Sequence, residues 1–270
     1  MSLPLPTSLS PSKVSTFKDC ALAFRFSAID KLPEPPSAPA VKGSLVHRAL
    51  ELLFVARPHE RTRAFADDCL AAATAEFMTN PEFVGLELDD VATGEFLADA
   101  ATMLSRYFEL EDPTRFDPVG VELMLSANVG DLLLRGIIDR LDLDENGELV
   151  VTDYKTGRVP SENQEMSRLG GVHFYAFLCQ QVFGRRPAKV QLMYLGASPQ
   201  IIIATPTEQS INGLEKRVQA IWSAVERACE HDDFRPKQSM LCNWCSFKEY
   251  CPAFGGDPEA ARLVGQLAGT

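Results

Sequence analysis

The chain has 270 residues, 46% of them apolar, which is typical of an ordinary globular protein with one large domain or two small ones. No apolar run approaches the roughly 18 residues needed to cross a bilayer, and the N-terminus lacks the basic start and apolar core of a signal peptide, so we expect a cytoplasmic protein with no membrane partner. The formal net charge of −11 argues against a protein that coats nucleic acid tightly, but it is compatible with a small basic groove and with acids that face metal ions.

The predicted elements change from helices to strands and back along the chain. Residues 11–30 begin with Ser-Pro-Ser and predict a capped helix, and the proline-rich 31–40 predicts an extended loop. A mainly helical region follows at about 43–115, before Val, Ile and Leu-rich strands separated by turn signals. The elements expected after that are a helix over 165–183, a strand over 188–196, a short apolar strand and a helix over 207–231. This order predicts an α/β fold with a strand-rich centre at 119–205, within a single domain over 1–270.

Two acids and a lysine converge in the segment GIIDRLDLDENGELVVTDYKTGR (136–158). Asp139, Asp153 and Lys155 occupy odd positions, and so do several apolar residues of both strands. A two-residue turn at the Asn-Gly pair would place the aspartates on different faces, whereas a three-residue loop with glycine in the left-handed conformation sets Asp139 opposite Asp153. The matching apolar faces select the second register, because a slip of one residue turns a strand inside out.

This group contains the parts of a phosphodiester hydrolysis site. Adjacent carboxylates raise each other's pKa unless a cation lies between them. Acids can hold Mg²⁺ or Mn²⁺, the metal lowers the pKa of a bound water, and the ammonium of Lys155 steadies that water or the developing negative charge. The alternative is a surface ion pair, which is disfavoured on the more apolar face because charge is costly there. We interpret Glu122, on the preceding strand, as a solvated glutamate rather than a residue that supports the site.

Four short motifs in order resemble the PD-(D/E)XK nuclease superfamily in its RecB-family form. GxxDR and DYKTG form the hairpin signature, KGSLVHRALE (42–51) resembles the upstream helix motif, and GGVHFYAFLC (170–179) resembles the downstream helix motif. The resemblance covers about residues 12 to 253. It implies a restriction-endonuclease-like fold, with a central mixed sheet flanked by helices, a helical insertion and a catalytic core at 119–205.

The resemblance also implies roles for the residues of the hairpin and the upstream helix. His47, Asp139 and Asp153 would be ligands of Mg²⁺ or Mn²⁺, with the carbonyl oxygen of Tyr154 as a fourth ligand. Lys155 would be the catalytic lysine. Taken alone, His47 lies in an apolar helix and is compatible with a hydrogen-bonded core histidine.

The downstream helix departs from the family pattern. Tyr175 would face DNA or support the lysine, although its position in an apolar stripe is also compatible with a core residue. The family has a glutamine four residues before this tyrosine, and here that position is Gly171. The departure puts the contribution of the helix in doubt, and Gln164 is an unsupported substitute.

Four of the seven cysteines form a candidate metal clasp. Cys242, Cys245 and Cys251 lie within ten residues, and Cys20 can supply a fourth thiolate from the other end of the chain. Four thiolates suit zinc, but zinc sites more often combine two CxxC knuckles, and the chain has one. The spacing resembles the iron–sulfur clasp of AddB-type nuclease domains and CRISPR-associated exonucleases, which implies a 4Fe–4S cluster joining the termini. The remaining cysteines are expected to be ordinary buried thiols: Cys69, Cys179 and Cys229.

We therefore expect a metal-dependent deoxyribonuclease, and the resemblance implies an exonuclease that acts on single-stranded DNA or DNA ends in repair or recombination. The alternatives are a non-catalytic DNA-binding or scaffold module, and the nuclease subunit of a complex with a separate helicase. Arg25, Arg140 and Arg158 are among the candidate phosphate contacts. The aromatic residues interleaved with the last cysteines, Trp244, Phe247 and Tyr250, are expected to pack around the cluster rather than to stack on bases.

Overall fold

The computed structural model describes residues 2–159 and 162–268, and it describes their side chains except at 162–170 and 266–268. The chain forms two compact units, each assembled from separate stretches of sequence. The sheet unit consists of Pro36–Leu125 and Ile137–Ile211, and the terminal unit consists of Met1–Pro35, Ser126–Gly136 and Asn212–Thr270. Within the described residues, no helix is long and apolar enough to cross a membrane.

A five-stranded mixed sheet has the order β1-β2-β3-β4-β5. Strands β2 and β3 pair antiparallel, β3 and β4 parallel, and β4 and β5 antiparallel. The parallel step needs a crossover connection, which is the helix α7 (Glu162–Phe183). The strands are β1 (Gly120–Val129), β2 (Leu132–Leu143), β3 (Leu149–Lys155), β4 (Lys189–Tyr194) and β5 (Gln200–Ala204). The predicted α/β fold with a mixed sheet flanked by helices is confirmed.

The predicted hairpin register is also confirmed. Thr152 pairs with Arg140 and Val151 with Leu141, which is the register that, extended by one residue, sets Asp139 opposite Asp153. The loop closes where the N–H of residue 144 donates to the carbonyl of residue 148 (2.9 Å), which leaves three residues in the loop. Its last residue, Gly147, has φ +73°, the left-handed conformation that glycine adopts without steric cost.

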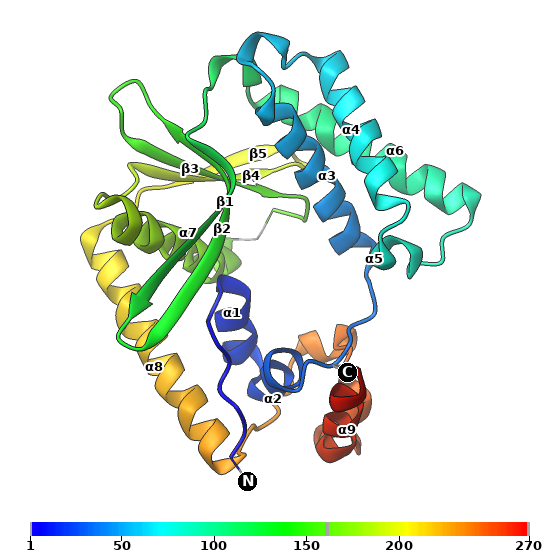
Figure 1. The fold of residues 1–270 in the computed structure, drawn as a ribbon, viewed down its shortest axis with the longest axis vertical. Coiled ribbons are helices and arrows are strands. Elements are labelled where there is room, and N and C mark those ends of the chain that lie inside the picture. The colour runs from blue at the N-terminus through cyan, green and yellow to red at the C-terminus, as the bar shows by residue number, and fades with distance from the viewer. Residues whose placement is uncertain (1, 160–161, 269–270) are drawn as a thin grey trace. The chain divides into compact units, whose positions relative to one another are not determined.

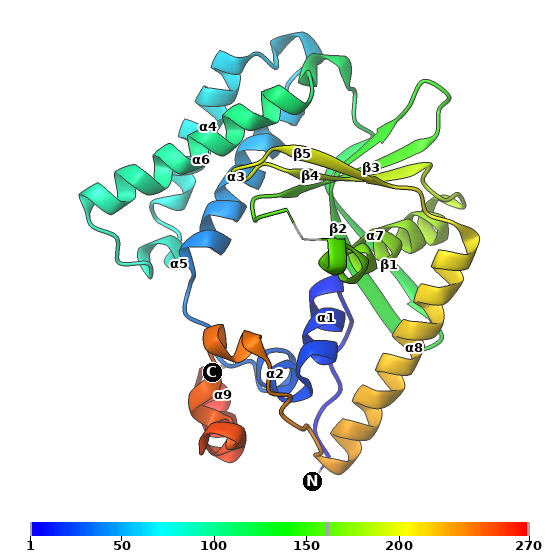
Figure 2. The ribbon, with the colours of Figure 1, turned by 180° about the vertical axis from the view of Figure 1, so that it is seen from behind.

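A group of helices covers one face of the sheet within the sheet unit. In Figures 1 and 2, α4 and α6 lie on the opposite side of strands β3–β5 from α7. The helices are α3 (Ala38–Val55), α4 (Arg63–Phe77), α5 (Pro81–Val84) and α6 (Asp90–Leu110). Their apolar side chains form one core with Tyr154 of β3, Met193 of β4 and Leu195, which follows β4. Helix α3 begins at Ala38, inside the segment predicted as a loop. A proline is tolerated in its first turn because backbone N–H groups there have no partner within the helix, so the missing N–H costs no hydrogen bond.

The burial of β2 differs from the predicted alternation. Of the odd-numbered residues expected on the apolar face, Leu141 is buried, but Ile137 and Leu143 are about half exposed. The even-numbered Ile138, Arg140 and Asp142 are buried as well. The reason is that helices cover the even-numbered face of the hairpin. Arg140 is 0% exposed, so the expectation that it contacts phosphate is wrong.

The buried Arg140 is the centre of a polar network. Its guanidinium donates to Asp142 (2.8 Å) and to Glu111, which follows α6. It also donates to the hydroxyl of Tyr154 (3.1 Å), and its Cζ atom lies 4.5 Å from the ring centroid of Phe54. The network ties the end of α6 to the centre of the hairpin.

In the terminal unit, the helix predicted over 11–30 is divided at Cys20. Helix α1 (Pro11–Asp19) ends there, because Cys20 has extended backbone angles, and α2 (Ala21–Phe24) and a π-helical turn (Arg25–Ile29) follow. The other helices of this unit are most of α8 (Glu208–His231) and α9 (Pro258–Ala268). Arg25 is buried and pairs with Asp30 (3.0 Å), Asp232 (2.9 Å) and Glu259 (3.4 Å), so its expected phosphate contact is wrong too.

Candidate metal centre

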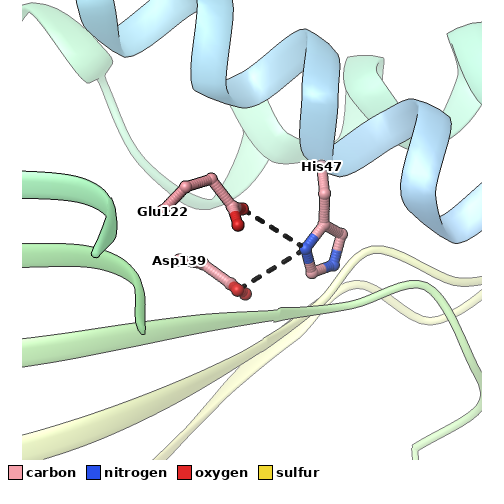
Figure 3. Close-up of side chains that lie close together, drawn as sticks. All are labelled: His47, Glu122 and Asp139. Atoms are coloured by element: carbon pink, nitrogen blue, oxygen red, sulfur yellow. Dashed lines mark ion pairs between the residues drawn. The ribbon is translucent and has the colours of Figure 1, made fainter. Parts of the chain in front are cut away.

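Three elements of the sheet unit bring a histidine and two carboxylates together. His47 comes from the middle of α3, Glu122 from β1 and Asp139 from β2, and their ligand atoms all lie within 4.8 Å of one another (Figure 3). His47 Nδ1 is 3.5 Å from Asp139 Oδ1 and 4.0 Å from Glu122 Oε1. Imidazole and carboxylate groups are ligands of divalent cations, so this group can hold a metal ion.

The backbone of Tyr154 orients two of these side chains. Its N–H donates to Asp139 Oδ2 (2.6 Å), and its carbonyl oxygen lies 3.1 Å from His47 Nε2. Because a carbonyl only accepts, His47 Nε2 carries the proton, and the lone pair of the neutral ring then lies on Nδ1, which faces the carboxylates. The local fold therefore directs Nδ1 toward the carboxylates, where it donates to Asp139 while the ring is charged and would be free to bind a metal ion once that proton is lost.

The next two predicted residues lie on β3 beside the same group. Asp153 is buried and forms an ion pair with Lys155, whose side chain is 39% exposed. Burial raises the pKa of the Asp153 carboxyl and so does the charge of Asp139, while Lys155 and His47 act in the opposite direction. A lysine beside the acids and open to solvent can reach a reacting group.

Burial and neighbouring charges shift the pKa values of the site residues. Burial and the nearby charge of Asp139 raise the pKa of Glu122 to about 7. Burial would lower the pKa of His47, but its hydrogen bond to Asp139 and the surrounding acids raise it above the ordinary value. Shifts of this direction are expected where carboxylates are held together without a counter-ion, and a bound divalent cation would reverse them.

A cavity of about 430 Å³ opens beside the histidine. It is lined by α3, β1 and the turn after β3, and the lining includes Gly43, Ser44, His47, Glu122 and Thr156. A Cβ on Gly43 would lie 2.9 Å from Thr156 Oγ1, so glycine permits the close approach of this helix to the turn. The cavity therefore borders two members of the group, His47 and Glu122.

The helix α7 contributes Tyr175 to the surroundings of the acids. Burial raises the pKa of Tyr175, and the charges of Asp153, Asp139 and Glu122 raise it further. A Cβ on Gly171 would meet no atom within 4 Å among the described residues, so space is open where the family has glutamine. The side chain of Gln164 lies outside the described residues.

Glu122 is expected from the sequence to be a solvated glutamate, but the structure places it beside His47 and Asp139. The sequence did carry a signal: counting outward from a two-residue turn at Gly130–Asp131 sets Glu122 against Asp139. Glu122 also has φ +45°, which is unusual for a residue with a side chain and is found where surrounding structure enforces it.

The four clasp cysteines lie in the terminal unit, where all four line one cavity of about 320 Å³. Their thiols are partly buried, and backbone N–H groups donate to two of them: Lys237 to Cys20 Sγ (3.5 Å) and Ser239 to Cys242 Sγ (3.4 Å). Burial raises the pKa of Cys245, and the three other cysteines contribute to the rise. Among the described residues, no three of these sulfurs form a compact ligand set like that at His47, and an iron–sulfur cluster is not shown.

The aromatic residues around this cavity divide into two kinds. Phe247 is 6% exposed, and its ring centroid lies 5.5 Å from that of Phe26; Tyr250 packs on the same ring at 6.2 Å. Trp244 is 76% exposed, so the expectation that it packs around the cysteines is wrong. The remaining cysteines are buried, and burial raises the pKa of each thiol, as expected for inert core residues: Cys69, Cys179 and Cys229.

Comparisons with known proteins establish the family of the chain. The family model of the PD-(D/E)XK nuclease superfamily matches residues 8–252, and the chain belongs to this superfamily. A candidate exonuclease from Eubacterium rectale has a similar solved structure, with a TM-score of 0.56 and 12% identity, covering 88% of this chain and 87% of the other. The structure of the protein SSO0001 also matches, with a TM-score of 0.45 and 13% identity over 93% of this chain and 88% of the other. No curated protein matches the chain.

Proposed function

We propose that this protein is a divalent-metal-dependent deoxyribonuclease that acts as an exonuclease on single-stranded DNA or DNA ends, in repair or recombination, within a single nuclease domain. The observation that carries the proposal is the convergence of His47, Glu122 and Asp139 from three elements, beside Asp153 and Lys155. The exonuclease character rests on the family resemblance and agrees with the description of the Eubacterium rectale protein.

His47, Asp139 and Asp153 would hold Mg²⁺ or Mn²⁺, and Glu122 extends this set. The carbonyl oxygen of Tyr154, predicted as a fourth ligand, faces His47 Nε2 and not the Nδ1 beside the carboxylates, so it would orient the histidine instead. The bound cation would polarise a phosphoryl oxygen and lower the pKa of a water molecule. Lys155 would orient that water or stabilise negative charge on the scissile phosphate, because Asp153 holds its ammonium beside the acids.

A cleavage assay tests the proposal. End-labelled single-stranded and duplex DNA is incubated with the protein in Mn²⁺, Mg²⁺ or EDTA. We expect metal-dependent products that are lost in Lys155→Ala and Asp139→Ala, since a catalytic lysine or ligand contributes a hundredfold or more, roughly, to such reactions. Lys189→Ala is the matched control, because Lys189 is a partly buried lysine of the neighbouring strand β4.

Three outcomes separate this proposal from its alternatives. Cleavage at the parent rate in both site variants would show that the site assignment is wrong. Binding of DNA without products under any divalent ion would favour a non-catalytic DNA-binding or scaffold module. Products that require an added helicase subunit would favour a role as the nuclease subunit of a helicase complex.

We also propose that Cys20, Cys242, Cys245 and Cys251 hold a 4Fe–4S cluster. Tetrahedral zinc with bonds of about 2.3 Å needs sulfurs only about 3.8 Å apart. The four cysteines instead surround a cavity of about 320 Å³ without forming a compact ligand set among the described residues, which favours a larger group over zinc. Backbone N–H donors to two of the sulfurs support the proposal, because such bonds stabilise ligating thiolates.

Iron and acid-labile sulfide are measured after purification without air. We expect both to be present in the parent protein and lost in Cys20→Ser. Cys229→Ala is the matched control, because Cys229 is a buried thiol of the same unit that does not line the cavity. One equivalent of zinc without sulfide would contradict the proposal.

A further inference from the structure

The cysteine cavity has an exposed rim that the proposed catalytic site does not use. Leu241, Trp244 and Phe254 line the cavity and remain 56%, 76% and 45% exposed. The cysteines beside them are more buried, so a cluster held by the thiols would leave the outer faces of these side chains open to solvent. An indole this exposed within a short CxxC loop contributes little to packing, which points to a role in contacting another molecule.

Lysines accompany the exposed rings. Lys237 and Lys248 line the same cavity and are exposed, and the Lys248 ammonium lies 4.7 Å from the ring centroid of Phe254. The acids of the lining, Asp19 and Glu34, come from the N-terminal segment. Rings and lysines therefore share the C-terminal part of the rim, in a chain whose formal net charge is −11.

This combination fits a single strand of nucleic acid. Proteins hold single strands by stacking unpaired bases on aromatic rings and by neutralising phosphates with lysine or arginine. A protein partner fits less well, because lysine is depleted at protein interfaces. Duplex DNA fits less well too, because its bases already stack on one another and leave no face for the indole.

We propose that this rim, composed of Leu241, Trp244, Phe254, Lys237 and Lys248, binds single-stranded DNA, with Trp244 stacking on a base and the two lysines contacting phosphates. The proposal rests on the proposed nuclease function, because it describes how the same protein holds its substrate strand. It requires no particular placement of the rim relative to the metal centre.

Binding is measured with the full-length protein purified without air, by fluorescence anisotropy of a labelled oligothymidine of about 20 nucleotides, in EDTA so that no cleavage occurs. We expect Trp244→Ala to weaken binding about tenfold and Trp244→Phe to retain most of the affinity, because a smaller ring still stacks. Lys237→Ala is expected to reduce the slope of log affinity against log salt by about 0.7, the value for one phosphate contact on a single strand.

Leu263→Ala is the matched control, because Leu263 is an apolar residue of the same unit that is 63% exposed on α9 and does not line the cavity. Equal thermal midpoints of Trp244→Ala and the parent show that a loss of binding is not a loss of folding, and Trp244→Phe provides a second comparison. Affinity of Trp244→Ala equal to that of Leu263→Ala overturns the proposal, and so does an equal loss of affinity for single-stranded and duplex DNA.

A separate measurement tests the nuclease site without this surface. Hydrolysis of a small phosphodiester by the parent protein with Mn²⁺ needs only the metal-centre residues, and it is expected to be lost in Lys155→Ala. If hydrolysis is seen but Trp244→Ala binds DNA normally, the surface is refuted and the nuclease function stands. If Trp244→Ala weakens DNA binding but no hydrolysis occurs, the nuclease function is refuted and the surface stands.

Discussion

Replacing Arg140 with methionine should destabilise the sheet unit in a manner that depends on pH. Arg140→Met keeps a side chain of similar length but removes the guanidinium from two buried carboxylates, Glu111 and Asp142, whose side chains are 8% and 4% exposed. Removing one partner of a buried ion pair costs about 3–5 kcal/mol, because the remaining charge has no counter-ion. Since both acids share one cation, we expect a total loss of about 3–5 kcal/mol at pH 8 and not twice that value.

The dependence on pH follows from the direction of the pKa shift. Burial already raises the pKa of Asp142 above its ordinary value, and Arg140 counteracts this rise, so its removal raises the pKa further. An acid whose pKa is higher in the folded state than in the unfolded state binds its proton more tightly when folded, and stability falls as pH rises between the two values. The loss of unfolding free energy in Arg140→Met relative to the parent should therefore shrink on acidification, to below about 2 kcal/mol near pH 5.

Urea unfolding followed by circular dichroism at several pH values measures this deficit. Arg158→Met, at an exposed arginine of the same unit, controls for the change of side chain. Adding Glu111→Gln and Asp142→Asn to Arg140→Met should recover much of the loss at pH 8, because no buried charge remains. A deficit below about 1 kcal/mol at pH 8, or one that is the same at every pH, would refute the reasoning.

Two further predictions concern the candidate metal centre and the turn that follows Cys251. Burial and Asp139 raise the pKa of Glu122 to about 7, so this carboxyl keeps its proton below that pH and must lose it to bind Mn²⁺. The Mn²⁺ affinity measured by calorimetry should therefore fall by about tenfold for each pH unit of acidification below 7, and Glu122→Gln should remove this dependence. An unchanged dependence of affinity on pH in Glu122→Gln would exclude Glu122 as a ligand. A Cβ on Gly256 would lie 2.0 Å from the Glu249 carbonyl oxygen, so Gly256→Ala should lower the thermal midpoint by about 5 °C, whereas Gly213→Ala, where a Cβ meets no described atom within 4 Å, should not.

The hairpin was predictable because its determinants are local. Asp139 and Asp153 are separated by one short loop, and the loop chemistry together with the matching strand faces allows only one register. The buried thiols and the mixed sheet were predictable for a similar reason, since apolar periodicity and turn residues are properties of short windows.

The surroundings of the hairpin were less predictable because they depend on distant residues. Arg140 is buried because Glu111, which follows α6, supplies its counter-ion, and an arginine in a strand is otherwise expected at the surface. Glu122 joins the candidate metal centre through the neighbouring strand β1 and an unusual backbone conformation, and neither is determined by residues of the β2–β3 hairpin. Trp244 was assigned to packing because its neighbours in sequence are cysteines, but its exposure depends on how the whole loop folds.

The alternation of β2 and β3 relates the buried network to the chemistry. Because successive side chains of a strand point to opposite faces, the strand that presents Asp139 to the metal centre must present Arg140 to the helices. By the same rule, the Tyr154 side chain points to the opposite face from Asp153 and Lys155. Its hydroxyl accepts a hydrogen bond from Arg140, while its backbone orients Asp139 and His47. A catalytic carboxylate group held by backbone atoms needs that backbone to be immobile, and a buried arginine that binds both strands and the end of a helix meets that need. The cation on one face of the sheet thus supports the acids on the other.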